Sequence, residues 1–84
     1  MSRHLLTCDD PALVLWVGWD EGLGTFFAQV EPPGAARPED LLLWIGQLPS
    51  DVVDLGELAD LVRRWARLDD ATIAILEGDR CARR

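Results

Sequence analysis

The chain contains no lysine and no tyrosine, only one histidine (His4) and only two cysteines. Without lysine, the glycines of residues 22–24 cannot form a Walker-type phosphate loop, which also needs a helix directly after it. Nucleophilic catalysis needs a base beside the nucleophile, and a chain with one histidine has few candidates for that base. His4, Cys8 and Cys81, taken with Asp9, lack the paired spacing of structural zinc sites. We therefore expect a protein that is not an enzyme and that holds no metal ion or other cofactor.

Long hydrophobic runs are absent as well. The apolar stretch of residues 12–19 is far shorter than the roughly 20 residues that span a bilayer as a helix. We therefore expect no membrane association. Nothing in the sequence resembles a secreted protein, so Cys8 and Cys81 are expected to be reduced, although one disulfide between them stays open. These features together predict a cytoplasmic protein.

Positive charge is scarce over most of the chain. The formal net charge is −7, from 15 acidic residues and 8 arginines. Residues 1–60 hold eleven of the acids and two of the arginines, whereas residues 61–84 hold four acids and six arginines. Such an acidic body disfavours direct binding to nucleic acid, whose affinity comes from cations that neutralise phosphates. The 49% hydrophobic content is too high for a disordered chain, and 84 residues fit a single domain.

Alternating apolar residues predict a β-hairpin. One strand is expected at residues 13–19 and another at residues 25–31, joined by a short turn that contains glycine. Residues 1–12 are expected to be a lead-in that ends in a turn. After the Pro-rich loop of residues 32–40, the run LLLWIG at residues 41–46 predicts a third strand.

The C-terminal half predicts helix. Asp54 is a favourable N-cap, and the apolar residues of 55–68 recur at helical spacing. Residues 70–80 fit either a second helix, capped by Asp69 or Asp70, or a β-branched strand; the helix is favoured. The predicted class is α+β, with a three-stranded antiparallel sheet (the β-hairpin plus a third strand) followed by one or two C-terminal helices packed on one face.

Strand alternation divides the sheet residues into two sets. The set expected to face the helices, with Trp65 packed on it, is aliphatic: Leu13, Leu15, Val17, Phe26, Ala28, Val30, Leu41, Leu43 and Ile45. The apolar members of the opposite set are Val14, Trp16, Phe27, Leu42 and Trp44. The free face of an antiparallel sheet is normally polar. An apolar, aromatic free face therefore predicts an interaction surface.

Two charged groups are secondary candidates for partner binding. Asp20 and Glu21 are adjacent carboxylates in the hairpin turn, where such groups are usually solvated and Asp20 can accept hydrogen bonds from turn amides. Arg63, Arg64 and Arg67 form a basic side of the predicted helix. That side is either a dock for an acidic partner or simply a solvated surface.

The pattern WVGWD…TFFAQV…LLWIG, at residues 16–20, 25–30 and 42–46, resembles that of a group of short bacterial proteins of uncharacterised activity. The resemblance implies a bacterial protein. It implies no activity and no catalytic residue.

We predict a non-catalytic protein that works by protein–protein contact through its aromatic sheet face. Trp16, Phe27 and Trp44 would be the anchors, because aromatic residues dominate interface energetics, with Val14 and Leu42 beside them. The partner is another protein or a second copy, and sequence leaves open which of the two covers the face. An alternative is that clustered carboxylates imitate phosphates and block a nucleic-acid-binding protein. No small-molecule substrate is evident.

Overall fold

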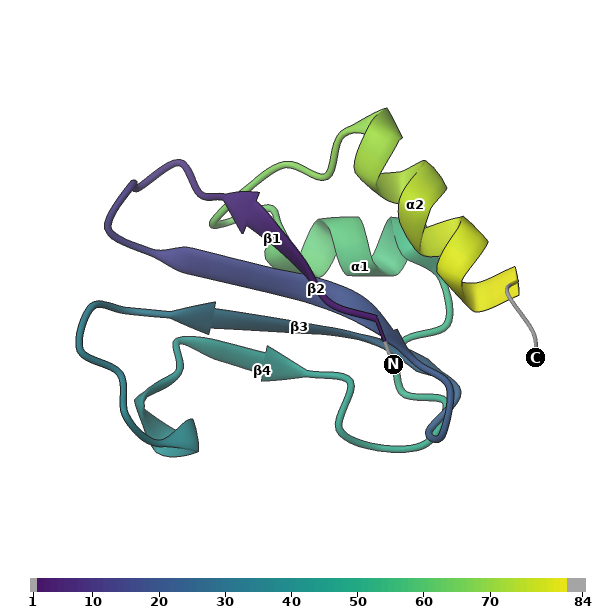
Figure 1. Ribbon diagram of the computed structural model, residues 1–84, viewed down its shortest axis with the longest axis horizontal. Coiled ribbons are helices and arrows are strands. Elements are labelled where there is room, and N and C mark those ends of the chain that lie inside the picture. Colours follow the sequence, from purple (N-terminus) through teal and green to yellow (C-terminus); the bar gives the residue numbers. More distant parts are fainter. Residues whose placement is uncertain (1, 82–84) are drawn as a thin grey trace.

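The computed structural model describes residues 2–81 and has the α+β class that the sequence predicts. An antiparallel sheet forms one layer, and two C-terminal helices lie together on one side of it (Figure 1). The elements in chain order are β1 (His4–Thr7), β2 (Val14–Asp20), β3 (Thr25–Glu31), a short 3-10 turn η1 (Pro38–Asp40), β4 (Leu43–Ile45), α1 (Leu55–Val62) and α2 (Asp70–Cys81). The strands lie in the order β1-β2-β3-β4, and every neighbouring pair is antiparallel.

Strand β1 corrects the prediction of a three-stranded sheet. Residues assigned to a lead-in pair with β2, with Leu5 opposite Trp16 and Thr7 opposite Val14. The sequence HLLT is too short to show the apolar–polar alternation by which a half-buried strand is recognised, and its two apolar residues are adjacent. β1 forms because the edge of the hairpin offers unpaired backbone groups, and because Leu6 packs against the core.

Strands β2 and β3 form the predicted hairpin. Their register ends with Asp20 opposite Thr25. In the turn, the Gly24 N–H donates to the Asp20 carbonyl at 2.8 Å, and the Leu23 N–H donates to the Asp20 carboxylate at 3.2 Å. Gly24 has a φ of 64°, which glycine adopts without steric cost. β3 has the predicted bounds, β2 is displaced by one residue, and β4 is shorter than the predicted 41–46.

The core lies on the face of the sheet that strand alternation predicts. The buried sheet residues of this core are Leu15, Val17, Phe26, Ala28 and Val30. The partly buried residues packed against them include Leu13, Leu43, Ile45 and Trp65. The prediction is wrong for Leu41, which lines a hollow with Trp44 on the opposite face. Leu41 precedes β4, and outside a strand the alternation no longer sets the direction of a side chain.

Helix α1 begins where the sequence predicts and ends earlier. The Asp54 carboxylate accepts the Gly56 N–H at 2.7 Å, so Asp54 is the N-cap. The helix was expected to reach Leu68 but ends at Val62. In the turn that follows, the Ala66 N–H donates to the Val62 carbonyl at 3.0 Å. Ala66 and Leu68, beyond the helix, are still buried in the core. Their apolar side chains continue the helical spacing in the sequence, which is why the sequence predicts a longer helix.

Residues 70–80 belong to a helix, as favoured, and not to a strand. The Asp69 carboxylate accepts the Thr72 N–H at 2.8 Å at the start of α2. This backbone hydrogen bond lowers the pKa of Asp69. Leu58 of α1 and Leu76 of α2 are fully buried against the sheet. Neither helix in residues 2–81 combines the length and the apolarity needed to cross a membrane.

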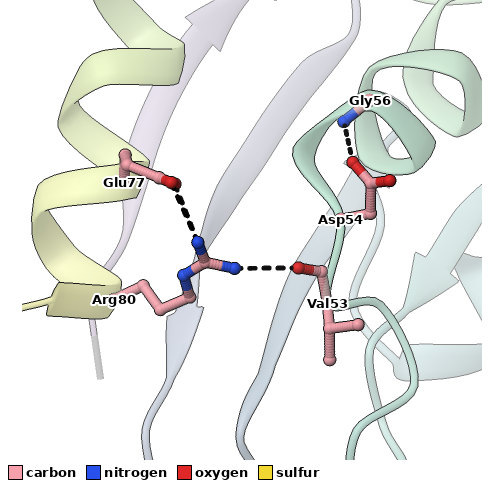
Figure 2. A network of polar contacts seen from close by, with 5 residues as sticks. All are labelled: Val53, Asp54, Gly56, Glu77 and Arg80. Carbon is pink, nitrogen blue, oxygen red and sulfur yellow. Dashed lines mark hydrogen bonds and ion pairs between the residues drawn. The ribbon is translucent and has the colours of Figure 1, made fainter.

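Arg80 links the end of α2 to the segment before α1 (Figure 2). Its guanidinium donates to the Val53 carbonyl at 2.9 Å and to the Glu77 carboxylate at 2.9 Å. It also lies 5.6 Å from the centroid of the Phe26 ring. Figure 2 shows the Asp54 cap beside these contacts. One side chain therefore touches α2, the entry to α1 and β3.

Candidate protein-binding face

The sheet face turned away from the helices is called the outer face below. Strand alternation places on it Leu5, Val14, Trp16, Phe27, Gln29 and Trp44. Four of these form one row across the sheet, because Leu5 lies opposite Trp16, Trp16 opposite Gln29, and Gln29 opposite Trp44. Leu42 directly precedes β4 and lies outside the paired register. The register thus places four of the predicted partner-binding residues on one face of the sheet: Val14, Trp16, Phe27 and Trp44.

Phe27 lies in the floor of the outer face and does not project from it. Only 7% of its surface is exposed. Its ring lies against Gly18 of β2, where an added Cβ would come within 2.6 Å of the ring. Its own Cβ is equally close to Gly46, where an added Cβ would lie 2.7 Å away. Because both neighbours lack side chains, Phe27 can sink between them, and it supports the face from beneath.

Trp16 is half-buried, and a cation covers its ring. The Arg3 guanidinium carbon lies 4.4 Å from the ring centroid, which is the geometry of a cation–π contact. Leu42 and Trp44 remain more open, with 51% and 39% of their surfaces exposed. Trp44 is therefore the most accessible of the three predicted aromatic anchors.

Two shallow hollows flank Trp44. One has a volume of about 380 Å³ and is lined by Phe27, Leu23 and Gln47 among others. The other has a volume of about 250 Å³ and is lined by Leu41, Ala35 and Arg37 among others. Trp44 and Gln29 line both hollows. The indole is thus a ridge between two recesses, and a partner could enclose it on both sides.

The secondary candidates have separate places in the fold. Asp20 accepts a turn amide, as expected, and also lines the larger hollow; Glu21 is exposed in the same turn. Because α1 ends at Val62, Arg63 and Arg64 lie in the turn after the helix, where both are exposed. Arg67 follows them, also exposed. The structure therefore does not bring the arginines to the outer face.

His4 makes a contact that the sequence does not predict. Its Nε2 lies 2.6 Å from Oδ2 of Asp79, so β1 is tied to α2 across 75 positions of sequence. Partial burial raises the pKa of Asp79, but hydrogen bonds from His4 and Ser2 outweigh that effect, and the pKa is lowered overall. No sequence signal pairs these residues, because neither lies in a recognisable motif.

The Ser2, His4 and Asp79 side chains do not have the order of a catalytic triad. In a triad the imidazole lies between the hydroxyl and the carboxylate, so that it can take the hydroxyl proton. Here the carboxylate of Asp79 interacts with both other groups. The Ser2 hydroxyl also accepts the Trp19 N–H at 3.0 Å. This cluster therefore joins the N-terminal strand to the C-terminal helix.

The two cysteines are free thiols in separate environments. Cys8 is buried, and burial together with the nearby charges of Asp9 and Asp10 raises the pKa of its thiol. Cys81 is exposed at the end of α2. Across residues 2–81, no three His, Cys, Asp or Glu side chains are grouped as they would be around a metal ion.

Comparisons with known proteins add no relative: no family model, no curated protein and no solved structure matches the chain. The functional argument therefore depends on the outer face itself.

Proposed function

We propose that this protein is a non-catalytic adaptor or regulator that binds another protein through its outer face. One observation carries the proposal: Trp44 stands 39% exposed between two hollows, at the β4 end of the row that crosses the outer face. Tryptophan is the residue type most enriched among interface hot spots. A Trp side chain enclosed on both sides by a partner loses most of its contact with water, which gives a large favourable free energy.

The surroundings of Trp44 suit a specific protein contact. Gln29 lies opposite it in the register and offers amide donors and acceptors beside the indole. Glu31 and Arg37 border the smaller hollow, while Arg3 and Asp20 border the larger. An apolar centre with a polar rim of both charge signs is the usual arrangement of a protein interface. It differs from a single-stranded nucleic-acid platform, whose aromatics sit in a basic groove.

A crosslinking experiment tests where a partner binds. A photoreactive phenylalanine analogue replaces Trp44 in one sample and Ile75 in a control sample, and both are exposed to a lysate of the source cells. Ile75 is a suitable control because it is 49% exposed on α2, in the helical layer. We expect one protein to be crosslinked from position 44 and not from position 75. Equal crosslinking from both positions would contradict docking on the outer face.

The binding energy is then measured with the purified partner by calorimetric titration. We expect Trp44→Ala to raise Kd by at least about 30-fold, the equivalent of a hot-spot loss of about 2 kcal/mol. Ile75→Ala should leave Kd unchanged. Both variants must keep the wild-type circular dichroism spectrum. An unchanged Kd for folded Trp44→Ala would refute the proposal.

The salt dependence of the same titration distinguishes the alternative function. An acidic chain that imitates nucleic-acid phosphates would lose most of its affinity as salt rises, because exposed charges are screened within about 8 Å at physiological ionic strength. Binding centred on Trp44 should change little between low and physiological salt. A steep loss of affinity with rising salt, together with an unchanged Kd for Trp44→Ala, would favour phosphate mimicry.

A further inference from the structure

The two edges of the sheet differ in how well they are protected against pairing. β4 has only three residues; it follows the acidic turn η1, and the next residue after it is Gly46, whose φ is 83°. Natural edge strands avoid pairing by being short or by carrying charges, prolines or bulges. β1 is also short, at four residues, but HLLT contains no proline, acidic residue or arginine, and it pairs with β2 in a register without a bulge. β1 is therefore the edge open to another strand.

The register identifies which backbone groups of β1 point outward. The Ser2 N–H donates to the Trp19 carbonyl at 3.0 Å, which makes this pair a hydrogen-bonded one. Hydrogen-bonded pairs recur at every second residue of an antiparallel ladder, so His4 and Leu6 direct their backbone groups to β2. The backbone N–H and C=O groups of Arg3, Leu5 and Thr7 therefore point away from β2, out of the edge of the sheet. Within residues 2–81, no turn or loop hydrogen bond reaches them.

These outward groups match a second copy of themselves. In an antiparallel pair centred on Leu5, Arg3 of one copy faces Thr7 of the other, Leu5 faces Leu5, and Thr7 faces Arg3. This arrangement looks the same from either copy, as a closed two-fold interface requires. We propose that two copies of this chain pair through β1 in this register, so that their two four-stranded sheets continue as one. This proposal is independent of the docking of another protein on the outer face.

Charge favours this antiparallel pairing over a parallel one. Arg3 stands before β1, while Asp9 and Asp10 follow it. An antiparallel partner brings Arg3 of each copy toward the acidic end of the other strand, whereas a parallel partner would align the two arginines. The Asp9 N–H already donates to the Trp65 carbonyl at 2.8 Å. That bond occupies the edge beyond Thr7 and limits the shared ladder to residues 3–7.

Leu5 explains why the pairing would hold. It is 60% exposed beside Trp16 on the outer face, although it lies in a strand. In the dimer, the two Leu5 side chains lie side by side and join the Leu5–Trp16 pair of one copy to that of the other. Because only a short strand from each copy takes part, the interface is smaller than the standard size of about 1,600 Å². We therefore expect dimerisation in the micromolar range.

The test uses opposite charges at the two-fold axis. Leu5→Lys and Leu5→Glu are prepared separately, and dimerisation is measured by sedimentation equilibrium from about 1 µM to several hundred µM. Each variant alone places like charges directly opposite each other, so we expect its Kd to rise by at least about tenfold. An equimolar mixture places lysine opposite glutamate and should recover dimers. Only a residue that meets its own copy gives this rescue.

Two controls separate this interface from the outer face. Leu48→Lys changes an equally exposed leucine outside the strands and should not affect the dimer. Trp44→Ala should also leave the dimer intact. Circular dichroism confirms that each variant is folded. The proposal would be overturned by a wild type that is monomeric at several hundred µM, or by a dimer Kd that Leu5→Lys leaves unchanged. A dimer that is lost in Trp44→Ala but kept in Leu5→Lys would also overturn it.

Discussion

The replacement Thr25→Val tests how the sheet is joined to the helical layer. Thr25 begins β3 and is fully buried. Its hydroxyl accepts the Val52 N–H at 2.7 Å, and its single proton lies within reach of the Phe26 carbonyl at 2.8 Å and the Val52 carbonyl at 3.1 Å. The Phe26 N–H donates to the Val52 carbonyl at 2.8 Å. Thr25 therefore fastens the hairpin to the segment that leads into α1.

Valine has the shape of threonine without the hydroxyl, so the substitution isolates the hydrogen bonds. It leaves the Val52 N–H without an acceptor at a residue that is only 2% exposed. A buried donor that loses its partner costs about 1–3 kcal/mol. The Val52 carbonyl keeps its bond from Phe26, so it adds little. We expect a loss of about 2 kcal/mol, which lowers Tm by about 8–16 °C in a domain of this size.

The measurement is urea and thermal unfolding of Thr25→Val, Thr25→Ser and Thr7→Val. Serine keeps the hydroxyl and removes one methyl group, which costs about 1 kcal/mol. Thr7 is exposed, so Thr7→Val should stay within about 0.5 kcal/mol of the wild type. Amide hydrogen exchange at Val52 should accelerate in Thr25→Val and not in Thr25→Ser. If Thr25→Val is as stable as the wild type, or more stable than Thr25→Ser, the hydroxyl does not hold this junction.

Three further outcomes follow from the structure. Gly18→Ala should destabilise by about 1–3 kcal/mol in thermal unfolding, because its Cβ would overlap the Ser2 carbonyl and the Phe27 ring; Gly22→Ala, with 3.4 Å to its nearest neighbour, is the control. Because the pKa of Asp79 is lowered in the folded protein, its charge stabilises the fold above the unfolded pKa of about 3.9. The difference in unfolding free energy between wild type and Asp79→Asn should therefore shrink as pH falls below about 4, and a difference that grows would refute this. Cys81 should react rapidly with a thiol reagent, whereas buried Cys8 should react only on unfolding; equal rates in native protein would contradict the described burial.

Sequence patterns predicted the parts of the fold that depend on local physics. β2 and β3 alternate over seven residues each, long enough to identify both the strands and the face that each side chain takes. Asp54 marks the start of α1 because an N-cap acts within one helical turn. The same alternation correctly separated Trp16 and Trp44 from the core. The face of the sheet on which these two side chains lie therefore follows from local sequence pattern.

Other features depend on contacts between distant residues. β1 exists because β2 offers it a partner, and four residues carry no period of their own. Alternation placed Phe27 on the outer face but could not reveal its burial, which comes from Gly18 on one strand and Gly46 after another. The pair of His4 and Asp79 joins opposite ends of the chain without any motif. Such contacts are properties of packing, which a single sequence does not display.

The sequence by itself determined the α+β class, the hairpin, the N-cap of α1 and the two-sided apolar character of the sheet, since each follows from residue spacing or from a short-range hydrogen bond. The tertiary structure decided how much of the aromatic face is accessible, because exposure depends on what neighbouring elements cover. In the folded chain Trp44 is exposed, Arg3 covers the ring of Trp16, and Phe27 is buried between Gly18 and Gly46. The tertiary structure also made β1 the edge of the sheet, because strand order follows from long-range pairing and not from local propensity.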